Sequence, residues 1–156
     1  MDYDVTLKEV ATEHLASVRG TYPMAQLPEV MQAEFARVMS ELVAEGVQPS
    51  GGAVTIYHGW TGDTVDAEIG FTIRGVFFPR NPKGPVKASR TPGGKVLFTV
   101  HVGHYVELEA AYKAIQSYAK ANRLELADVM WERYLTDPAT EPDLSKHVTE
   151  VYWPVA

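Results

Sequence analysis

The sequence of 156 residues predicts an α+β fold in which two helices cover one face of a single sheet. Two segments place apolar residues at the spacing of one helical face, and short segments of alternating or β-branched residues lie between them. The order strand, helix, strand occurs twice along the chain. We therefore expect a fold built from two β-α-β units.

Composition limits both the class and the partners of the protein. With 46% hydrophobic and 22% charged residues, the length suits one globular domain over residues 1–156. A formal net charge of -6 disfavours direct binding of nucleic acid. The absence of cysteine excludes thiol catalysis, cysteine-ligated zinc and disulfides. No apolar run approaches the roughly 18 residues of a membrane span, and the acidic N-terminus lacks a signal-peptide core, so we expect a cytoplasmic protein without membrane contact.

The first half of the chain predicts four strands around one helix. Residues 3–10 and 14–19 alternate apolar and polar side chains, which is typical of strands. The helix begins at Leu27-Pro28-Glu29, because proline is tolerated in a first turn and glutamate suits the helix dipole, and it ends at Gly46. Residues 53–57, bounded by glycines, and residues 65–73 are the next two strands. The apolar helical face comprises Met31, Phe35, Val38, Met39 and Leu42.

The second half follows a similar order. Residues 80–92 are rich in proline and are expected to form a loop, and residues 96–101 form a strand after it. A second helix is expected from residue 108 to about Asn122, and residues 129–135 and 148–154 are the last two strands. The apolar face of this helix comprises Leu108, Ala111, Tyr112, Ile115, Tyr118 and Ala119.

The two halves resemble each other as an internal repeat. Gly20-Thr21-Tyr22 precedes the first helix and Gly103-His104-Tyr105 precedes the second. The strand after each helix ends near a tyrosine, Tyr57 in the first half and Tyr134 in the second. We therefore expect pseudo-repeats over about residues 1–75 and 76–156.

Glu132 is the most informative single residue. Strand alternation places Met130, Glu132 and Tyr134 on one face of their strand, with Trp131 and Leu135 on the other face, beneath the helices. A buried carboxylate is costly without a partner, so its place between methionine and tyrosine indicates a site. An exposed glutamate on an edge strand, or one paired with lysine or arginine of a neighbouring strand, is the alternative.

Aromatic residues favour the first interpretation. A tyrosine in a strand is by itself only a good β former. Tyrosines near strand ends, gathered around Glu132, would form an aromatic cage with an anionic floor, which suits an organic cation. Glu150 lies on the same side of the last strand as Tyr152 and is a second acidic candidate. The tyrosines concerned are Tyr22, Tyr57, Tyr105, Tyr134 and Tyr152.

Common catalytic and metal-binding motifs are absent from the sequence. It contains no G-x-S-x-G, H-E-x-x-H, P-loop or strand-following G-x-G-x-x-G motif. His101 and His104 are its one close histidine pair, and no carboxylate stands at a ligand-like spacing from them. We therefore expect neither a metal nor a cofactor.

Four segments together resemble the GyrI-like family, the effector-binding domain of AraC-type and MerR-type multidrug-responsive regulators. The resemblance extends over essentially the whole chain. The segments that carry it are Val18-Arg19-Gly20-Thr21-Tyr22, Val100-His101-Val102-Gly103-His104-Tyr105, Trp131-Glu132-Arg133-Tyr134-Leu135-Thr136-Asp137-Pro138 and Thr149-Glu150-Val151-Tyr152-Trp153-Pro154-Val155.

The resemblance implies two β-α-β-β repeats that form a curved antiparallel sheet, with two helices on one side and a ligand groove between the repeats. It implies that Glu132 is the acid of the pocket, in the family's Glu-x-Tyr strand motif. The lining residues that it implies are Tyr105, Tyr134 and Tyr152, with Tyr22 and Tyr57 from the first repeat.

The chain departs from the family pattern at the turn before the second helix. Val102 and His104 stand where the family has arginine and proline. His104 could bring a titrating group to the rim of the pocket or could point to solvent. Since residues 3–10 already form a strand, no DNA-binding segment precedes the domain, and we expect a stand-alone member of the family.

Three functions follow as expectations. The first is binding of lipophilic, cationic aromatic molecules, as a multidrug-type sensor in transcription regulation or as a sequestrant, with a separate DNA-binding or gyrase partner. The second is a hydrolase that opens cyclopropane-bearing genotoxins, with Glu132 as general base. The third is a protein-interaction module of gyrase-inhibitor type. The same residues serve binding and hydrolysis, so the sequence leaves these two open.

Overall fold

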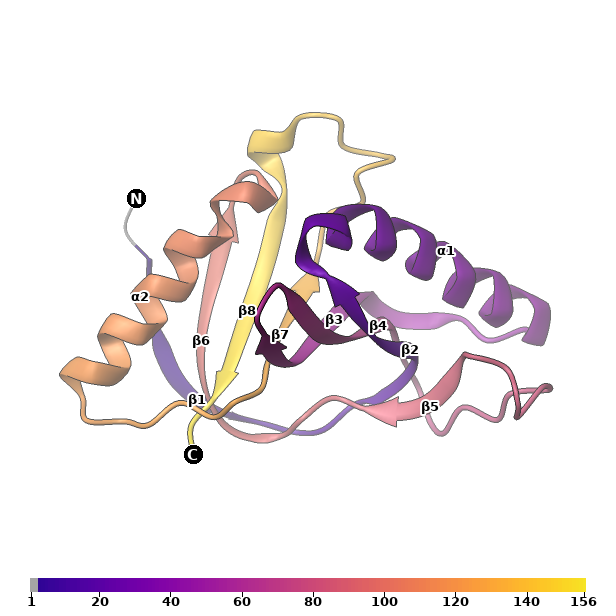
Figure 1. Ribbon diagram of the computed structural model, residues 1–156, viewed down its shortest axis with the longest axis horizontal. Helices are drawn as coiled ribbons and strands as arrows, with labels where there is room; N and C mark the ends of the chain where they lie inside the picture. The colour runs from indigo at the N-terminus through magenta and orange to yellow at the C-terminus, as the bar shows by residue number, and fades with distance from the viewer. Residues whose placement is uncertain (1–2) are drawn as a thin grey trace. The chain divides into compact units, whose positions relative to one another are not determined.

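The computed structural model describes residues 3–156, which fall into two compact units (Figure 1). The N-terminal unit comprises Thr12–Pro92, and the C-terminal unit comprises residues 3–11 together with Gly93–Ala156. Each unit combines an antiparallel ladder of strands with one long helix, which confirms the predicted α+β class.

The N-terminal unit contains a ladder in the order β3-β4-β2-β5. Strand β4 pairs with β2 over the whole length of both strands and with β3 on its other edge. Its elements are β2 (His14–Pro23), the 3-10 turn η1 (Met24–Gln26), α1 (Leu27–Glu45), β3 (Pro49–Thr61), β4 (Thr64–Ile73) and β5 (Lys87–Arg90).

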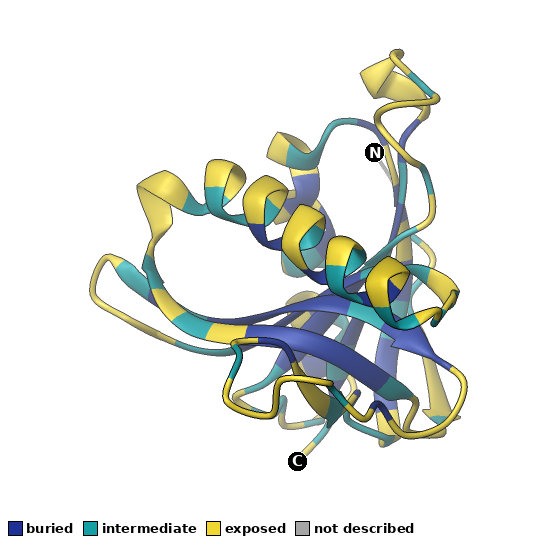
Figure 2. Cartoon of the chain, turned by 90° about the vertical axis from the view of Figure 1, so that its right-hand side faces the viewer, coloured by how far each residue is buried: buried dark blue, intermediate teal, exposed yellow. Residues whose placement is uncertain are grey.

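Helix α1 has the predicted bounds. Pro28 lies in its first turn, and Gly46 ends it in the left-handed conformation with φ 70°, where its N–H donates to the carbonyls of Leu42 and Val43. The outer side of α1 is exposed and the side toward the strands is buried, as Figure 2 shows. Beneath it lies a core cluster that comprises Ala16, Val18, Val38, Leu42, Ile73, Phe77 and Val86.

The C-terminal unit contains a ladder in the order β1-β6-β8-β7. Helix α2 packs against β6 and β8 and buries Leu108, Ala111, Ile115 and Ala119. The elements of this unit are β1 (Thr6–Val10), β6 (Gly94–Val102), η2 (Tyr105–Glu107), α2 (Leu108–Ala121), β7 (Met130–Tyr134), η3 (Leu144–Lys146) and β8 (Val148–Pro154).

One strand lies where the sequence predicted a loop. Within the proline-rich stretch 80–92, Lys87–Arg90 pairs with β2 as the edge strand β5. An edge strand donates and accepts ladder hydrogen bonds on one side alone, so a short polar segment between prolines can serve as one. Strand β3 is also longer than residues 53–57, and its register shifts between Tyr57 and Gly59.

Both units contain the order β-α-β-β that the resemblance implied, with β5 added to the N-terminal unit and β1 to the C-terminal unit, and their bounds differ from those of the expected repeats. Strand β1 pairs with β6 and so belongs to the C-terminal unit. The 3-10 turns begin at Met24 and Tyr105, and the helices that follow begin at Leu27 and Leu108. Tyr105 therefore corresponds to Met24, and its expected correspondence with Tyr22 is wrong by two residues.

The expected correspondence between Tyr57 and Tyr134 holds. Tyr57 pairs with Ala67, which pairs in turn with Gly20 of β2. Tyr134 pairs with Thr149, and Thr149 pairs with His101, the residue of β6 that matches Gly20.

No helix in the described part of the chain is long and apolar enough to cross a membrane.

The close approach of β2 and β4 gives a test of the N-terminal ladder. A Cβ atom at Gly70 would lie 2.0 Å from the backbone oxygen of Ala16. We expect Gly70→Ala to lower the free energy of unfolding by about 1–3 kcal/mol or more, as overpacking does, in a urea titration. Gly59→Ala, whose Cβ would meet nothing within 4 Å, is the control and should leave stability within about 0.5 kcal/mol. Equal changes in the free energy of unfolding of the two variants would contradict the close contact between Gly70 and Ala16.

Candidate functional site

Glu132 lies at the centre of β7 with its carboxylate buried, 1% exposed. The hydroxyl of Tyr134, two residues along the strand, donates to Oε1 at 2.7 Å. The hydroxyl of Tyr112, which comes from α2, donates to Oε2. The alternative of an exposed edge glutamate is therefore wrong, and the predicted common face of Met130, Glu132 and Tyr134 carries the contacts with the helix.

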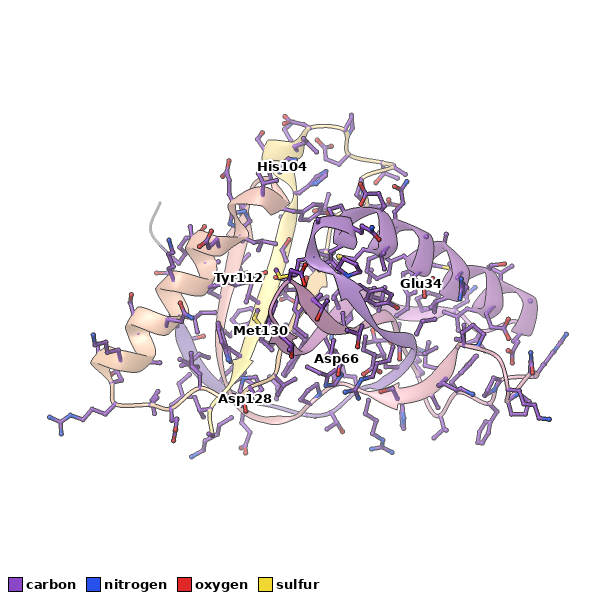
Figure 3. All side chains as sticks on the ribbon, in the orientation of Figure 1. Glu34, Asp66, His104, Tyr112, Asp128 and Met130 are labelled. Carbon is purple, nitrogen blue, oxygen red and sulfur yellow. The ribbon has the colours of Figure 1, made fainter. Side chains whose placement is uncertain are left out.

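The contact from α2 also corrects the orientation of β7. Because Tyr112 reaches Glu132 from the helix, the face of β7 beneath α2 is that of Glu132, and Trp131 lies on the other face. The prediction that Trp131 packs beneath the helices is wrong. Figure 3 labels Tyr112 on α2 and the fully buried Met130 at the start of β7.

Tyr105 begins η2 and lies against the residues around Glu132. Its ring meets that of Tyr134 edge to face, with centroids 5.6 Å apart, and lies 5.3 Å from the ring of His147. Burial raises the pKa of Tyr105, and the negative charges of Asp137 and Glu132 raise it further. Tyr105, Tyr134 and Glu132 are thus brought together as the sequence predicted.

His101, near the end of β6, and His104, before η2, hold the backbone from which the Tyr105 side chain extends. His104 accepts a hydrogen bond at Nδ1 from the N–H of Val106, which makes it the cap of η2. The fully buried His101 donates from Nε2 to the carbonyl of His104 and accepts at Nδ1 from the hydroxyl of Tyr3 at 2.8 Å. Within residues 3–156 no three potential ligands gather as a metal site.

Tyr152 and Glu150 lie on the opposite face of the same ladder. Strand register pairs Trp131 with Tyr152 and Arg133 with Glu150, and cross-strand partners point to the same side. The rings of Trp131 and Tyr152 stack with centroids 4.8 Å apart, and the Tyr152 hydroxyl donates to Glu150. The expectation that Tyr152 and Glu150 gather around Glu132 is therefore wrong.

This opposite face holds cations from the chain itself. The ammonium of Lys8 lies 3.5 Å from the centroid of Phe98, whose ring packs against Tyr152. Nε of Arg133 lies 3.9 Å from a carboxylate oxygen of Glu150. The aromatic rings and the acid on this side thus already have basic partners within the C-terminal unit.

Tyr22 and Tyr57 belong to the N-terminal unit. They lie on the same face of their ladder as Gly20, the face that α1 covers. The Tyr22 side chain covers Gly20, and burial together with the charge of Glu34 raises its pKa. Tyr57 is buried and stacks on Trp60 with centroids 5.5 Å apart. Their role as lining residues stays a prediction.

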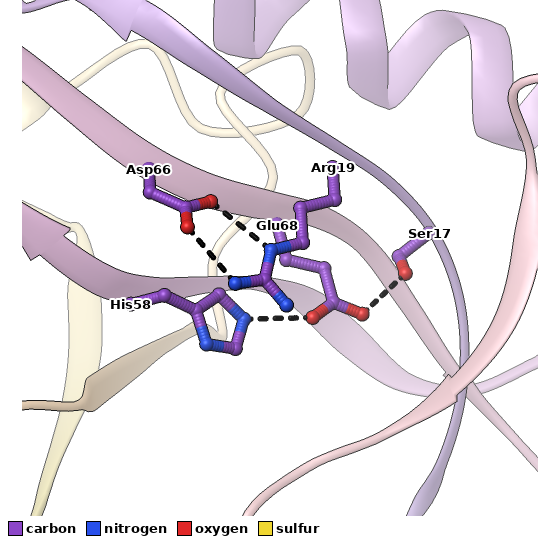
Figure 4. Close-up of polar contacts among 5 residues, drawn as sticks. All are labelled: Ser17, Arg19, His58, Asp66 and Glu68. Carbon is purple, nitrogen blue, oxygen red and sulfur yellow. Dashed lines mark hydrogen bonds and ion pairs between the residues drawn. The ribbon is translucent and has the colours of Figure 1, made fainter.

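Sequence reasoning missed a second buried carboxylate, Glu68 of β4. It is 4% exposed and accepts hydrogen bonds from Ser17 at 2.6 Å and from Nε2 of His58 at 2.9 Å (Figure 4). Arg19 donates twice to the nearby Asp66. The signal was an acid that alternates with apolar residues within a predicted strand, the same signal that identified Glu132.

A hollow of about 380 Å³ in the C-terminal unit is lined by Tyr3, Glu107, Glu109, Ala110 and Lys113. None of the residues predicted to bind a ligand lines it. Glu132 is buried under neighbouring side chains, so a ligand that contacts its carboxylate must displace some of them.

The two hydroxyls on Glu132 predict a loss of stability when one is removed. Tyr112→Phe takes a donor from a buried carboxylate, which costs roughly 1.5–3 kcal/mol, and a urea titration measures this directly. Tyr118→Phe, on the same helix, is the matched control and should cost less than about 0.5 kcal/mol. Equal losses would show that the hydrogen bond to Glu132 does not stabilise the fold.

The neighbourhood of Tyr105 predicts an electrostatic effect at alkaline pH. Because the pKa of Tyr105 is raised in the folded state, the protonated phenol contributes to the free energy of unfolding. This contribution is complete below pH about 10, the ordinary pKa of tyrosine, and is lost as the pH rises through the pKa of Tyr105 in the folded state. Asp137→Asn should move the pKa of Tyr105 down toward its ordinary value, measured by NMR titration of labelled tyrosine rings. Asp143→Asn makes the same charge change in the same loop, and an equal shift with this variant would contradict the assignment.

No curated protein matches the chain, but a family model and solved structures do. The C-terminal domain of EcmrR has a TM-score of 0.84 at 21% identity, with 100% of this chain and 99% of that domain covered. In EcmrR bound to DNA the match covers 98% of this chain, which spans 57% of the length of EcmrR, at a TM-score of 0.81 and 21% identity.

Two further structures share the fold at lower identity. SAV2435 bound to tetraphenylphosphonium has a TM-score of 0.63 at 15% identity, with 100% and 94% of the chains covered. A hydrolase from Listeria innocua has a TM-score of 0.67 at 14% identity, with 97% and 91% covered. The model of the GyrI-like small molecule binding domain matches residues 3–156, so the chain belongs to the GyrI-like family.

Proposed function

We propose that this small-molecule-binding domain takes lipophilic organic cations, with Glu132 as the counter-ion. One observation carries the proposal: the buried carboxylate of Glu132 accepts hydrogen bonds from the phenols of Tyr112 and Tyr134. Phenol donors are neutral, so they hold the carboxylate in place without cancelling its charge. In a buried environment that charge favours a cationic ligand strongly.

The aromatic rings beside Glu132 supply the second part of the recognition. Tyr105 and Tyr134 meet edge to face next to the carboxylate. Their ring faces can contact the flat body of a cation, at roughly 0.5–2 kcal/mol for each desolvated contact. The occurrence of tetraphenylphosphonium in the related fold of SAV2435 supports this class of ligand.

Charge also explains how the covered site can discriminate. A ligand that takes the place of the Tyr112 or Tyr134 hydroxyl on Glu132 removes a hydrogen bond to a buried carboxylate. A cation compensates for the lost hydrogen bond through its attraction to the carboxylate charge, whereas a neutral aromatic molecule makes no such charge interaction. The phenols thus act as a selectivity device for charged ligands.

The relatives support a biological setting for the proposed binding. EcmrR contains a domain of this fold within a protein that binds DNA, which supports a role in ligand sensing for transcription regulation. Sequestration of toxic cations in the cytoplasm is the second use of the same binding site. In the sensing role, a DNA-binding or gyrase partner would respond to the bound state.

Hydrolysis is the second candidate, favoured by the fold shared with the Listeria innocua hydrolase. Glu132 would accept the proton of a water molecule that attacks a strained cyclopropane carbon. The electron pair of the broken ring bond would pass into the conjugated carbonyl of the substrate, and a tyrosine hydroxyl would protonate the resulting oxyanion.

Calorimetric titration with tetraphenylphosphonium and with 9-aminoacridinium tests the proposal. We expect micromolar binding of both cations and none of neutral triphenylphosphine oxide. Glu132→Gln removes the negative charge and should weaken cation binding at least tenfold, about 1.4 kcal/mol.

Glu150→Gln is the matched control, because it removes an acid from the opposite face of the same ladder and should change the affinity less than threefold. Equal affinities for the wild type and Glu132→Gln would overturn the proposal. Mass spectrometry of the recovered ligands, and of a cyclopropane-bearing substrate, separates binding from hydrolysis.

A further inference from the structure

Residues 74–90, which lead from the end of β4 through β5, form a basic segment in an acidic protein (Figure 1). The basic segment contains five lysine or arginine residues and no acid, so its charge is +5, whereas the rest of the chain has a charge of -11. Such a concentration of one sign of charge indicates an interaction surface. Its basic residues, all of them exposed, are Arg74, Arg80, Lys83, Lys87 and Arg90.

The basic segment also exposes two large apolar side chains. Val76 is 50% exposed and Phe78 is 80% exposed. Phe77, between them, is buried, and it belongs with Val86 to the core cluster beneath α1. The segment is therefore anchored from within, while Val76 and Phe78 are presented to the outside in a stretch that an arginine bounds at either end.

Hydrogen bonds hold the backbone of the basic segment. The N–H of Arg80 donates to a carboxylate oxygen of Glu45 at 3.2 Å, and the N–H of Gly84 donates to the carbonyl of Asn81 at 2.9 Å. No acid among residues 3–156 forms an ion pair with any of the five basic side chains. The backbone is thus fixed and the side-chain charges stay available to a partner.

Protection of the sheet edge explains only part of this composition. Lysine and arginine on an edge strand prevent its pairing with other chains. Lys87 and Arg90 lie on the edge strand β5, but the other three basic residues and Phe78 lie outside it. An exposed phenylalanine favours association, which is the opposite of protection.

An anionic lipid surface matches both properties of the segment. Its headgroups attract basic residues, and an apolar side chain can enter the layer beneath them. Charges are screened over roughly 10 Å at 0.1 M salt, so the lipid surface responds to the +5 of the segment more than to the net charge of -6. Nucleic acid also offers phosphates, but the aliphatic Val76 provides no ring on which a base can stack.

We propose that the basic segment docks on the surface of an anionic membrane, with Phe78 and Val76 beneath the headgroups and the basic side chains among them. Such docking needs no membrane-spanning helix. Lipophilic cations concentrate at anionic membranes by the same charge and apolar attraction, so docking would bring the domain to the class of ligand proposed for Glu132. The docking itself does not depend on ligand binding at Glu132.

Sedimentation of the whole chain with lipid vesicles tests the proposal. Vesicles of equal parts phosphatidylglycerol and phosphatidylcholine should bind the chain about tenfold more tightly than vesicles of phosphatidylcholine alone, and about 0.5 M salt should remove most of this difference. Phe78→Ser should weaken binding to the mixed vesicles about tenfold. Val106→Ser, which changes a residue of η2 that is 77% exposed, is the matched control and should stay within about twofold.

Paired charge reversals separate the segment from the net charge of the protein. Arg74→Glu combined with Lys83→Glu, and Lys113→Glu combined with Lys120→Glu on α2, each exchange two positive charges for two negative ones. The first pair should weaken binding to the mixed vesicles about tenfold and the second less than about threefold. Circular dichroism of each variant verifies that it is folded.

Equal binding to the two kinds of vesicle, or equal losses with the two pairs of reversals, would overturn the proposal. Fluorescence anisotropy with labelled single-stranded DNA tests the other partner. Binding of DNA without binding of vesicles would replace lipid by nucleic acid and so overturn it as well. Because these measurements contain no organic cation, a failure of the function proposed for Glu132 leaves their outcome unchanged.

Discussion

The burial of one negative charge organises the C-terminal unit. Glu132 stays beneath α2 because a phenol from the helix and a phenol from its own strand donate to its two oxygens. The helix therefore depends on more than its apolar face for its position, since Tyr112 ties it to β7. The same two hydroxyls that stabilise the fold also cover the carboxylate that we propose as the counter-ion, so ligand binding at Glu132 would compete with stability.

The register of β7 and β8 determines which acid has this role. Glu132 and Glu150 both alternate with aromatic residues, yet pairing of Arg133 with Glu150 puts the second acid on the far face of the ladder. There Lys8 and Arg133 of the same chain already provide positive charge. Two similar sequence patterns thus give one acid held by phenols and one acid beside basic groups.

Much of the fold could be predicted because local patterns are sufficient for it. The ends of α1 follow from Pro28 and Gly46, and strand alternation placed Glu132 and Tyr134 on one face. The predictions that were wrong concern residues whose positions depend on pairing between distant segments. No local signal gives the register that sends Tyr152 away from Glu132, or the pairing that makes a strand of Lys87–Arg90. Tyr112 was read as part of an apolar face because its ring is apolar and its hydroxyl has a partner far along the chain.

The hydrogen bonds of His101 connect the start of the described chain to the loop that opens α2. Tyr3 donates to one ring nitrogen and the other donates to the carbonyl of His104. His104 in turn caps the 3-10 turn that begins with Tyr105. The side chain of Tyr3 is thus joined by two hydrogen bonds to the backbone of His104, the residue before Tyr105. We therefore expect a change in the position of Tyr3 to alter the backbone from which the Tyr105 ring extends.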